Sequence, residues 1–120
     1  MLEINGINEL DDFLFNNKNN VICLYFGAPW CGPCKKLKLK IVDEDNLKEM
    51  SLLSVCHIDV DNSLNQEIID IYSVENLPTQ IFITINNNSV ELFDKIIGYD
   101  WIGFKMMYEK VLKKNEKTIY

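Results

Sequence analysis

Arginine is absent from this sequence of 120 residues, and lysine supplies all 12 of its basic charges. Because there are 18 acidic residues, the formal net charge is -6. A protein that binds a phosphate backbone needs a stripe of basic side chains on its surface. The composition therefore disfavours nucleic-acid binding, and we expect no nucleic-acid partner.

Long apolar runs are also missing from the chain. A helix that crosses a bilayer needs ~20 consecutive apolar residues, and no segment of the sequence provides them. The first 20 residues are acidic and lack the apolar run of a secretory signal or the basic character of a transit peptide. We therefore expect no membrane association and a cytoplasmic location, where thiols are kept reduced.

Hydrophobic residues make up 48% of the chain and charged residues 25%, which is typical of a globular protein with a core. The length fits one domain. We assign residues 1–120 to this single domain and expect residues 115–120 to be a loose C-terminal tail.

Hydrophobic spacing in the first half of the chain predicts alternating helices and strands. Leu10, Phe13 and Leu14 recur at helical intervals and predict a short first helix. Residues 21–26 are apolar without alternation, which is typical of a strand buried on both faces. The stretch from residue 34 to about residue 50 predicts one amphipathic helix.

The second half of the chain predicts a buried strand over residues 52–59 and a hairpin whose strands cover residues 79–85 and 90–97. Asparagines at 86–88 suit its turn, since asparagine tolerates a positive φ. Two further helices are predicted from apolar residues at helical spacing: Leu64, Ile68, Ile71 and Tyr72, capped by Asn62 or Ser63, and then Trp101, Phe104, Tyr108, Val111 and Leu112. This order predicts an α/β fold with a central mixed sheet, parallel first and antiparallel in the C-terminal hairpin, flanked by helices.

The sequence Trp30-Cys31-Gly32-Pro33-Cys34-Lys35 joins the first predicted strand to the second helix. Two cysteines three positions apart across a turn have Cα atoms within about 7 Å, which overlaps the ~4.4–6.8 Å range of disulfides. The helix N-terminus would stabilise the Cys31 thiolate, which is the nucleophilic form. We expect Cys31 to be the exposed nucleophile and Cys34 the partly covered resolving thiol of a redox-active disulfide.

The residues around the cysteines have supporting roles in this interpretation. Pro33 has a fixed φ that suits the first turn of a helix, and Gly32 lets a substrate backbone approach closely. Lys35 could help to hold a thiolate or attract acidic partners.

Two other interpretations of the cysteine pair are less favoured. A zinc site needs a second pair of ligands, but Cys23 and Cys56 are isolated on predicted strands and His57 is the only histidine. A purely structural disulfide is uncommon where thiols are kept reduced. We therefore expect no metal, and we interpret Cys23 and Cys56 as small buried hydrophobic residues.

The chain resembles the thioredoxin family over roughly residues 2–114. The resemblance rests on the cysteine motif after a buried strand and on three shorter features: Leu77-Pro78-Thr79 before a strand, Asp59-Val60-Asp61 after one, and Gly98 after the last one. It implies the thioredoxin fold and thiol-disulfide exchange that reduces protein disulfides. It also implies electrons from NADPH through a flavin-dependent thioredoxin reductase as partner, with no cofactor bound to the chain itself.

The resemblance further implies how a substrate would bind. A cis peptide at Leu77-Pro78 would turn the backbone of Leu77 toward a bound peptide. An apolar rim would surround it, made of Trp30, Pro33, Ile97, Gly98 and Tyr99. We expect a monomer, although this rim would permit weak self-association.

Four positions depart from the family pattern. Tyr25 replaces a buried aspartate that serves the second cysteine, and His57 replaces a nearby lysine. We hypothesise that a water or the Tyr25-His57 pair moves the proton, since histidine titrates near neutral pH; a histidine that only packs is the alternative. Leu39 replaces a helix-kinking proline, and Tyr99 is bulkier than the usual small residue.

Other functions stay open at this point. A secretory oxidant or isomerase would favour histidine between the cysteines, and a glutaredoxin usually carries Pro-Tyr there, whereas this chain has Gly32-Pro33. A binding module whose dithiol only conditions association with a partner is the alternative from a different class. Such a module should tolerate serine at Cys31, whereas an oxidoreductase should not.

Overall fold

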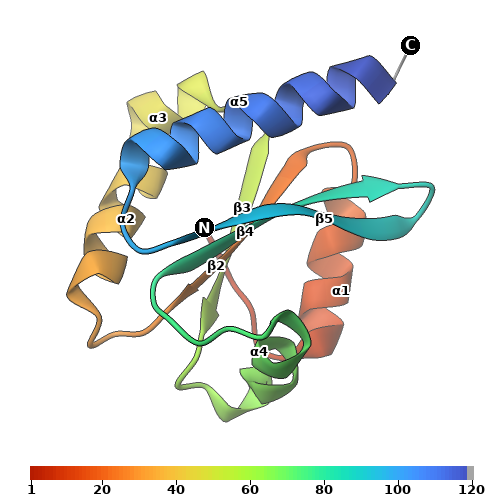
Figure 1. Ribbon diagram of the computed structural model, residues 1–120. Coiled ribbons are helices and arrows are strands. Elements are labelled where there is room, and N and C mark those ends of the chain that lie inside the picture. Colours follow the sequence, from red (N-terminus) through yellow and green to blue (C-terminus); the bar gives the residue numbers. More distant parts are fainter. Residues whose placement is uncertain (119–120) are drawn as a thin grey trace.

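The computed structural model describes residues 1–118, and the side chains of residues 1–115. Its centre is one five-stranded mixed sheet with the strand order β1-β3-β2-β4-β5 (Figure 1). Strands β1 and β2 run parallel to β3, while β4 is antiparallel to β2 and β5 to β4. This is the mixed sheet that the sequence predicts. The strands are β1 Leu2–Glu3, β2 Val21–Gly27, β3 Leu53–Asp59, β4 Thr79–Asn86 and β5 Ser89–Ile97.

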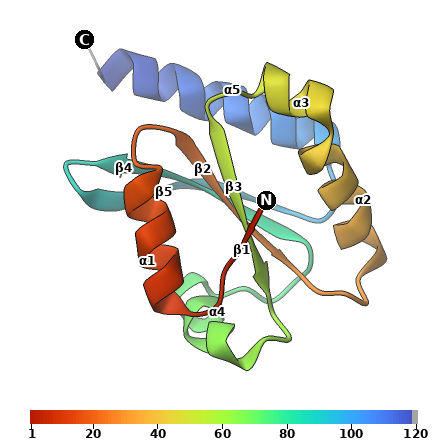
Figure 2. The same cartoon turned by 180° about the vertical axis from the view of Figure 1, so that it is seen from behind.

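Helices cover both faces of this sheet (Figure 2). Apolar residues of α1 and α4 form one buried cluster with one face of β2, and those of α2 and α5 form another with its opposite face. The α-helices are α1 Ile7–Asn16, α2 Gly32–Val42, α3 Glu44–Glu49, α4 Gln66–Tyr72 and α5 Trp101–Thr118, and the 3-10 helix η1 is Ser63–Asn65. None of the helices among residues 1–118 combines the length and the apolar character that crossing a membrane requires.

Strand β2 is buried along its whole length. Val21, Cys23 and Tyr25 face α2 and α5, while Leu24 and Phe26 face α1 and α4. Because both faces need apolar side chains, the strand reads as a continuous apolar run, which confirms the prediction for residues 21–26.

The single helix predicted from residue 34 to about residue 50 is wrong. Helix α2 ends at Val42, and α3 begins at Glu44 after a break at Asp43. The Asp43 carboxylate accepts hydrogen bonds from the backbone N–H groups of Asp45 and Asn46, at 3.0 and 3.1 Å, which caps the new helix. Leu39, in contrast, lies inside the uninterrupted α2, and its side chain is exposed.

The apolar face predicted for the helix after β3 is also partly wrong. Leu64 and Ile71 are exposed, and of the predicted positions only Ile68 is fully buried. Leu64 lies in the 3-10 helix η1, whose tighter winding gives it a different face from that of Ile68 in α4. Asn62 caps this turn as predicted, with its side chain accepting from the backbone N–H of Leu64.

The C-terminal part differs from the prediction at its end. Asn87 and Asn88 both have positive φ and close the β4–β5 hairpin, as predicted. Residues 115–118, however, continue helix α5 instead of forming a loose tail, because glutamate and lysine are good helix formers. Residues 119–120 of the predicted tail lie outside the described residues.

Asn65 ties the N-terminal strand to the rest of the fold, and the sequence analysis did not identify it. Its side chain is fully buried and accepts a hydrogen bond from the backbone N–H of Gly6 at 2.9 Å. Its amide donates to the backbone carbonyls of Ile4 and Asp59, at 3.1 and 3.0 Å. One amide group therefore satisfies three backbone groups, two in residues 4–6 and one at the end of β3.

We predict that Asn65→Ala lowers the free energy of unfolding by about 2–4 kcal/mol, since it leaves buried backbone groups without partners. Asn19→Ala is the matched control, because Asn19 is exposed, and it should change stability by less than about 0.5 kcal/mol. Urea unfolding of the two variants measures both values. Equal stability of the two variants would contradict the role assigned to Asn65.

Candidate active site

The two cysteines lie where the chain leaves the buried β2 and enters α2. Cys31 is the N-cap of the helix, and its backbone N–H donates to the carbonyl of Ala28 at 3.2 Å, which closes the preceding turn. Its Sγ accepts a hydrogen bond from the backbone N–H of Cys34 at 3.2 Å. Cys31 and Cys34 form a disulfide across 5.2 Å between their Cα atoms, within the range that disulfides require. The predicted redox pair is therefore assembled by one helical turn.

Both cysteines are buried in this disulfide form. Cys31 is 6% exposed and Cys34 is 2% exposed, so the expectation of an exposed Cys31 is wrong for this state. The Cys31 sulfur turns back over the end of the helix and joins the same apolar cluster as Ala28 and Cys34. A helix N-terminus and an N–H donor at a sulfur both favour its thiolate.

Cys31 opens onto a groove of about 390 Å³. Its walls include Trp30 and Leu77, as the sequence analysis predicts for the substrate side, together with Val60, Ile69, Val74, Glu75 and Asn76. Trp30 is 69% exposed, and its indole N–H donates to the Asp61 carboxylate at 2.8 Å. The groove gives an extended segment of another protein access to the disulfide.

The predicted cis peptide is present between Leu77 and the buried Pro78. The backbone N–H of Gly98 donates to the Pro78 carbonyl at 2.7 Å, so the segment after β5 is held beside the cis-proline. Ile97 and Tyr99 flank this glycine and are exposed, but they lie outside the lining of the Cys31 groove. Only part of the predicted rim therefore lines this groove. Pro33, another member of the rim, is exposed at the start of α2, as is its neighbour Gly32.

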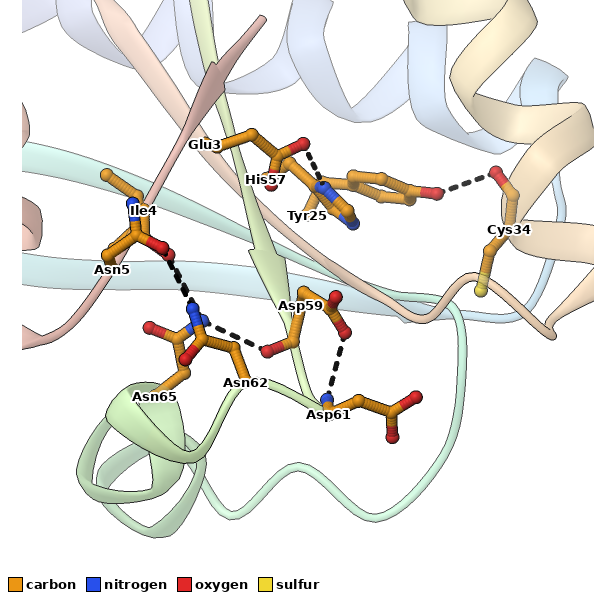
Figure 3. A network of polar contacts seen from close by, with 10 residues as sticks. All are labelled: Glu3, Ile4, Asn5, Tyr25, Cys34, His57, Asp59, Asp61, Asn62 and Asn65. Atoms are coloured by element: carbon orange, nitrogen blue, oxygen red, sulfur yellow. Dashed lines mark hydrogen bonds and ion pairs between the residues drawn. The ribbon is translucent and has the colours of Figure 1, made fainter.

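On the inner side of Cys34 the structure brings together Tyr25, His57 and Glu3 (Figure 3). The Tyr25 hydroxyl donates to the backbone carbonyl of Cys34 at 2.6 Å. Its ring stacks on the His57 imidazole with 4.8 Å between centroids. His57 Nδ1 lies 2.6 Å from a carboxylate oxygen of Glu3. No pattern in the sequence points to Glu3, because strand β1 has only two residues and therefore no recognisable alternation of apolar and polar residues.

Burial controls the ionisation of several groups near the site. It raises the pKa of Tyr25 to about 12, and the Glu3 charge adds to this effect. The phenol therefore stays protonated at neutral pH and acts as a donor. Burial also raises the pKa of the thiols of Cys23 and Cys56, which suits the predicted role of small hydrophobic residues, because a buried thiol is a poor nucleophile.

Lys35 is exposed, and with Lys38 it lines the cavity that also contains Tyr25 and His57. Among residues 1–118, no cluster of three or more histidine, cysteine or acidic side chains is arranged to hold a metal ion.

We predict that Tyr25→Phe flattens the alkaline loss of stability. Between pH 10 and about 12 the unfolded tyrosine ionises while the folded one keeps its proton, so the wild type loses stability as the pH rises. The variant lacks this contribution, and at neutral pH it should lose about 0.5–2 kcal/mol with the hydrogen bond. Urea unfolding from pH 7 to 12 measures both effects, and parallel curves for the two proteins would contradict the assignment.

Known proteins are similar to this chain in sequence. The family model described as thioredoxin matches residues 6–98. A thioredoxin of Mycoplasmoides gallisepticum is 33% identical over 82% of this chain and 89% of its own length. A protein disulfide isomerase-like protein of Arabidopsis thaliana is 34% identical over 92% of this chain, which spans only 20% of that relative.

Solved structures agree with the sequence comparison. The thioredoxin of Fasciola hepatica matches with a TM-score of 0.78 and 27% identity, covering 92% of this chain and 98% of that one.

The chain spans less than two thirds of the length of several curated relatives, including 62% of thioredoxin 3 of Plasmodium falciparum. These comparisons confirm the predicted thioredoxin fold. With the family match over residues 6–98 and the Cys31–Cys34 disulfide at the start of α2, the chain belongs to the thioredoxin family.

Proposed function

We propose that this protein is a thiol-disulfide oxidoreductase that reduces disulfides of other proteins through Cys31 and Cys34. The observation that carries the proposal is the Cys31–Cys34 disulfide at the N-terminus of α2, beside a groove that ends at the cis-proline segment. A purely structural disulfide would have no need of this groove. The family membership supports the same chemistry.

The reaction starts from the dithiol form. The Cys31 thiolate attacks one sulfur of a substrate disulfide, forms a mixed disulfide and releases the other substrate sulfur as a thiolate. Cys34 then loses its proton and attacks the Cys31 sulfur. The second substrate thiolate leaves, and the Cys31–Cys34 disulfide closes. Two electrons have moved from the dithiol to the substrate, and the substrate thiolates take up two protons.

The geometry supports this division of roles between the cysteines. Cys31 lines the groove, whereas Cys34 is absent from its lining and lies deeper in the fold. The Cys34 backbone is also held by Tyr25. Only Cys31 is therefore placed to meet a substrate first, and Cys34 is placed to resolve the mixed disulfide from within.

A substrate segment would lie along Leu77, where the cis peptide orients the backbone, and against the exposed Trp30 ring. Pairing of an extended peptide with exposed backbone is a common recognition mode. The groove walls are largely apolar side chains from three separate segments, which suits apolar side chains next to the disulfide of a substrate protein.

We further propose that the electrons come from NADPH through a flavin-dependent thioredoxin reductase, and that the protein works as a cytoplasmic monomer. Cys23 and Cys56 are free thiols, which suits a compartment that keeps thiols reduced. The dithiol carries the electrons itself, so the reaction requires no cofactor bound to this chain.

The proposal predicts that the wild type supports NADPH consumption in the presence of a thioredoxin reductase and insulin disulfides. Cys31→Ser should abolish turnover, because no nucleophile remains at the groove. Cys34→Ser should accumulate a mixed disulfide between Cys31 and insulin, which is detected as a covalent adduct by non-reducing mass spectrometry.

Cys23→Ser is the control, because Cys23 is a free thiol that lines neither the groove at Cys31 nor the cavity at Cys34, and it should keep wild-type turnover if it folds. Full turnover by Cys31→Ser would overturn the mechanism. Binding of a partner that survives the Cys31→Ser change, together with an inert wild type, would favour the binding module instead.

A further inference from the structure

A second cavity, of about 550 Å³, reaches Cys34 from the side of strands β1 and β3. Tyr25, His57 and Glu3, which Figure 3 shows beside Cys34, line this cavity together with the resolving cysteine. The groove for the substrate lies next to Cys31 and contains none of these three side chains. Cys34 therefore lines a cavity that is separate from the substrate groove and contains ionisable side chains.

The Glu3 carboxylate determines how the His57 ring is protonated. A carboxylate only accepts hydrogen bonds, so the short Nδ1 contact places the proton of a neutral ring on Nδ1. The lone pair of the neutral ring is then on Nε2. Glu3 thus fixes the orientation of the His57 imidazole and leaves Nε2 as its acceptor atom. This is the usual arrangement when a carboxylate orients a basic histidine.

Gly27 keeps the space at Nε2 open. A Cβ atom placed on Gly27 would lie 3.3 Å from His57 Nε2 and 3.1 Å from the Tyr25 hydroxyl. Nε2 and this hydroxyl therefore border the same small volume at the end of β2. Any side chain at residue 27 would press against both atoms.

The other charged and polar groups of the cavity are poorer proton acceptors. Tyr25 stays protonated and uses its proton on the Cys34 carbonyl. Lys35 and Lys38 from α2 also line the cavity, and ammonium groups have no acceptor site. Asp59 at the end of β3 is the one rival base, but one of its oxygens already accepts from the backbone N–H of Asp61 at 2.9 Å.

We propose that His57, oriented by Glu3, accepts the proton of Cys34 through water in this cavity when Cys34 attacks the mixed disulfide. The inference rests on the proposed dithiol mechanism and specifies its second step. The Cys34 S–H bond breaks, its proton passes to His57 Nε2, and the sulfur electron pair forms the bond to Cys31. The substrate thiolate leaves, and the imidazolium later returns the proton to solvent.

In this scheme Glu3 and Tyr25 are positioning residues. Glu3 fixes the ring and stabilises the imidazolium by its charge. Tyr25 stacks on the ring and holds the Cys34 backbone, so that His57 and Cys34 line the same cavity. The cavity contains polar side chains and is large enough for water to bridge His57 and Cys34.

The test separates the two chemical steps by stopped-flow with the aromatic disulfide DTNB, which releases one coloured thiolate per step. We expect His57→Gln to slow the second, concentration-independent phase at least 10-fold at pH 7. The first phase should change less than 2-fold, because Cys31 is on the groove side. The pH profile of the second-phase rate should show an inflection in the wild type, because the accepting group must be unprotonated, and the variant should lose it.

Glu3→Gln provides a second variant whose substitution site is more than half exposed. It should slow the second phase, since the His57 ring loses the carboxylate that orients it. Lys38→Gln is the control for the charge of the cavity and should keep both the inflection and the first phase. The melting temperature of each variant is recorded with the rates.

Three results would overturn the inference. One is a second phase of His57→Gln with the wild-type rate and pH profile. Another is loss of the inflection in Asp59→Asn but not in His57→Gln, which would assign the proton to Asp59. The third is an equal slowing of both phases with a lowered melting temperature, which indicates a structural role. A wild type without any second phase would instead contradict the dithiol mechanism itself.

Discussion

The burial of β2 on both faces is the constraint on which the site depends. This strand lies between β3 and β4 and is covered by helices on each side, so its register with both neighbours is fixed. Its C-terminal end then determines where the turn to Cys31 begins and where α2 starts. The same register places Tyr25 opposite His57 on β3, and thereby puts an aromatic ring and an imidazole behind the resolving cysteine.

The two cysteines consequently face different surroundings, although they are three residues apart. Cys31 lies at an apolar groove beside the cis-proline segment, where another protein would bind. Cys34 lies at a cavity that holds a histidine and its carboxylate partner. This division suits a reaction in two steps, since the first step needs access to a substrate and the second needs a route for a proton.

The sequence was sufficient for the sheet, the cysteine pair and the hairpin because those features are local or strongly periodic. The continuous apolar run of β2 and the asparagines at the hairpin each have one structural solution. The break at Asp43 was missed because capping competes with a helical pattern that continues through it. Glu3 and Asn65 were missed because Glu3 contacts His57 and Asn65 contacts Gly6 across more than fifty residues, and no local pattern encodes such contacts.

The central claim is that Cys31 and Cys34 alone exchange electrons with a substrate, and the most direct measurement is a count of thiols by position. The reduced protein is mixed with insulin, then unfolded in denaturant that contains an alkylating agent. Peptide mass spectrometry identifies which cysteines carry the label. The account predicts that the thiols of Cys31 and Cys34 disappear together, in step with the insulin thiols that form, while Cys23 and Cys56 remain alkylated. Loss of the Cys23 or Cys56 thiol, or insulin reduction with all four thiols retained, would contradict it.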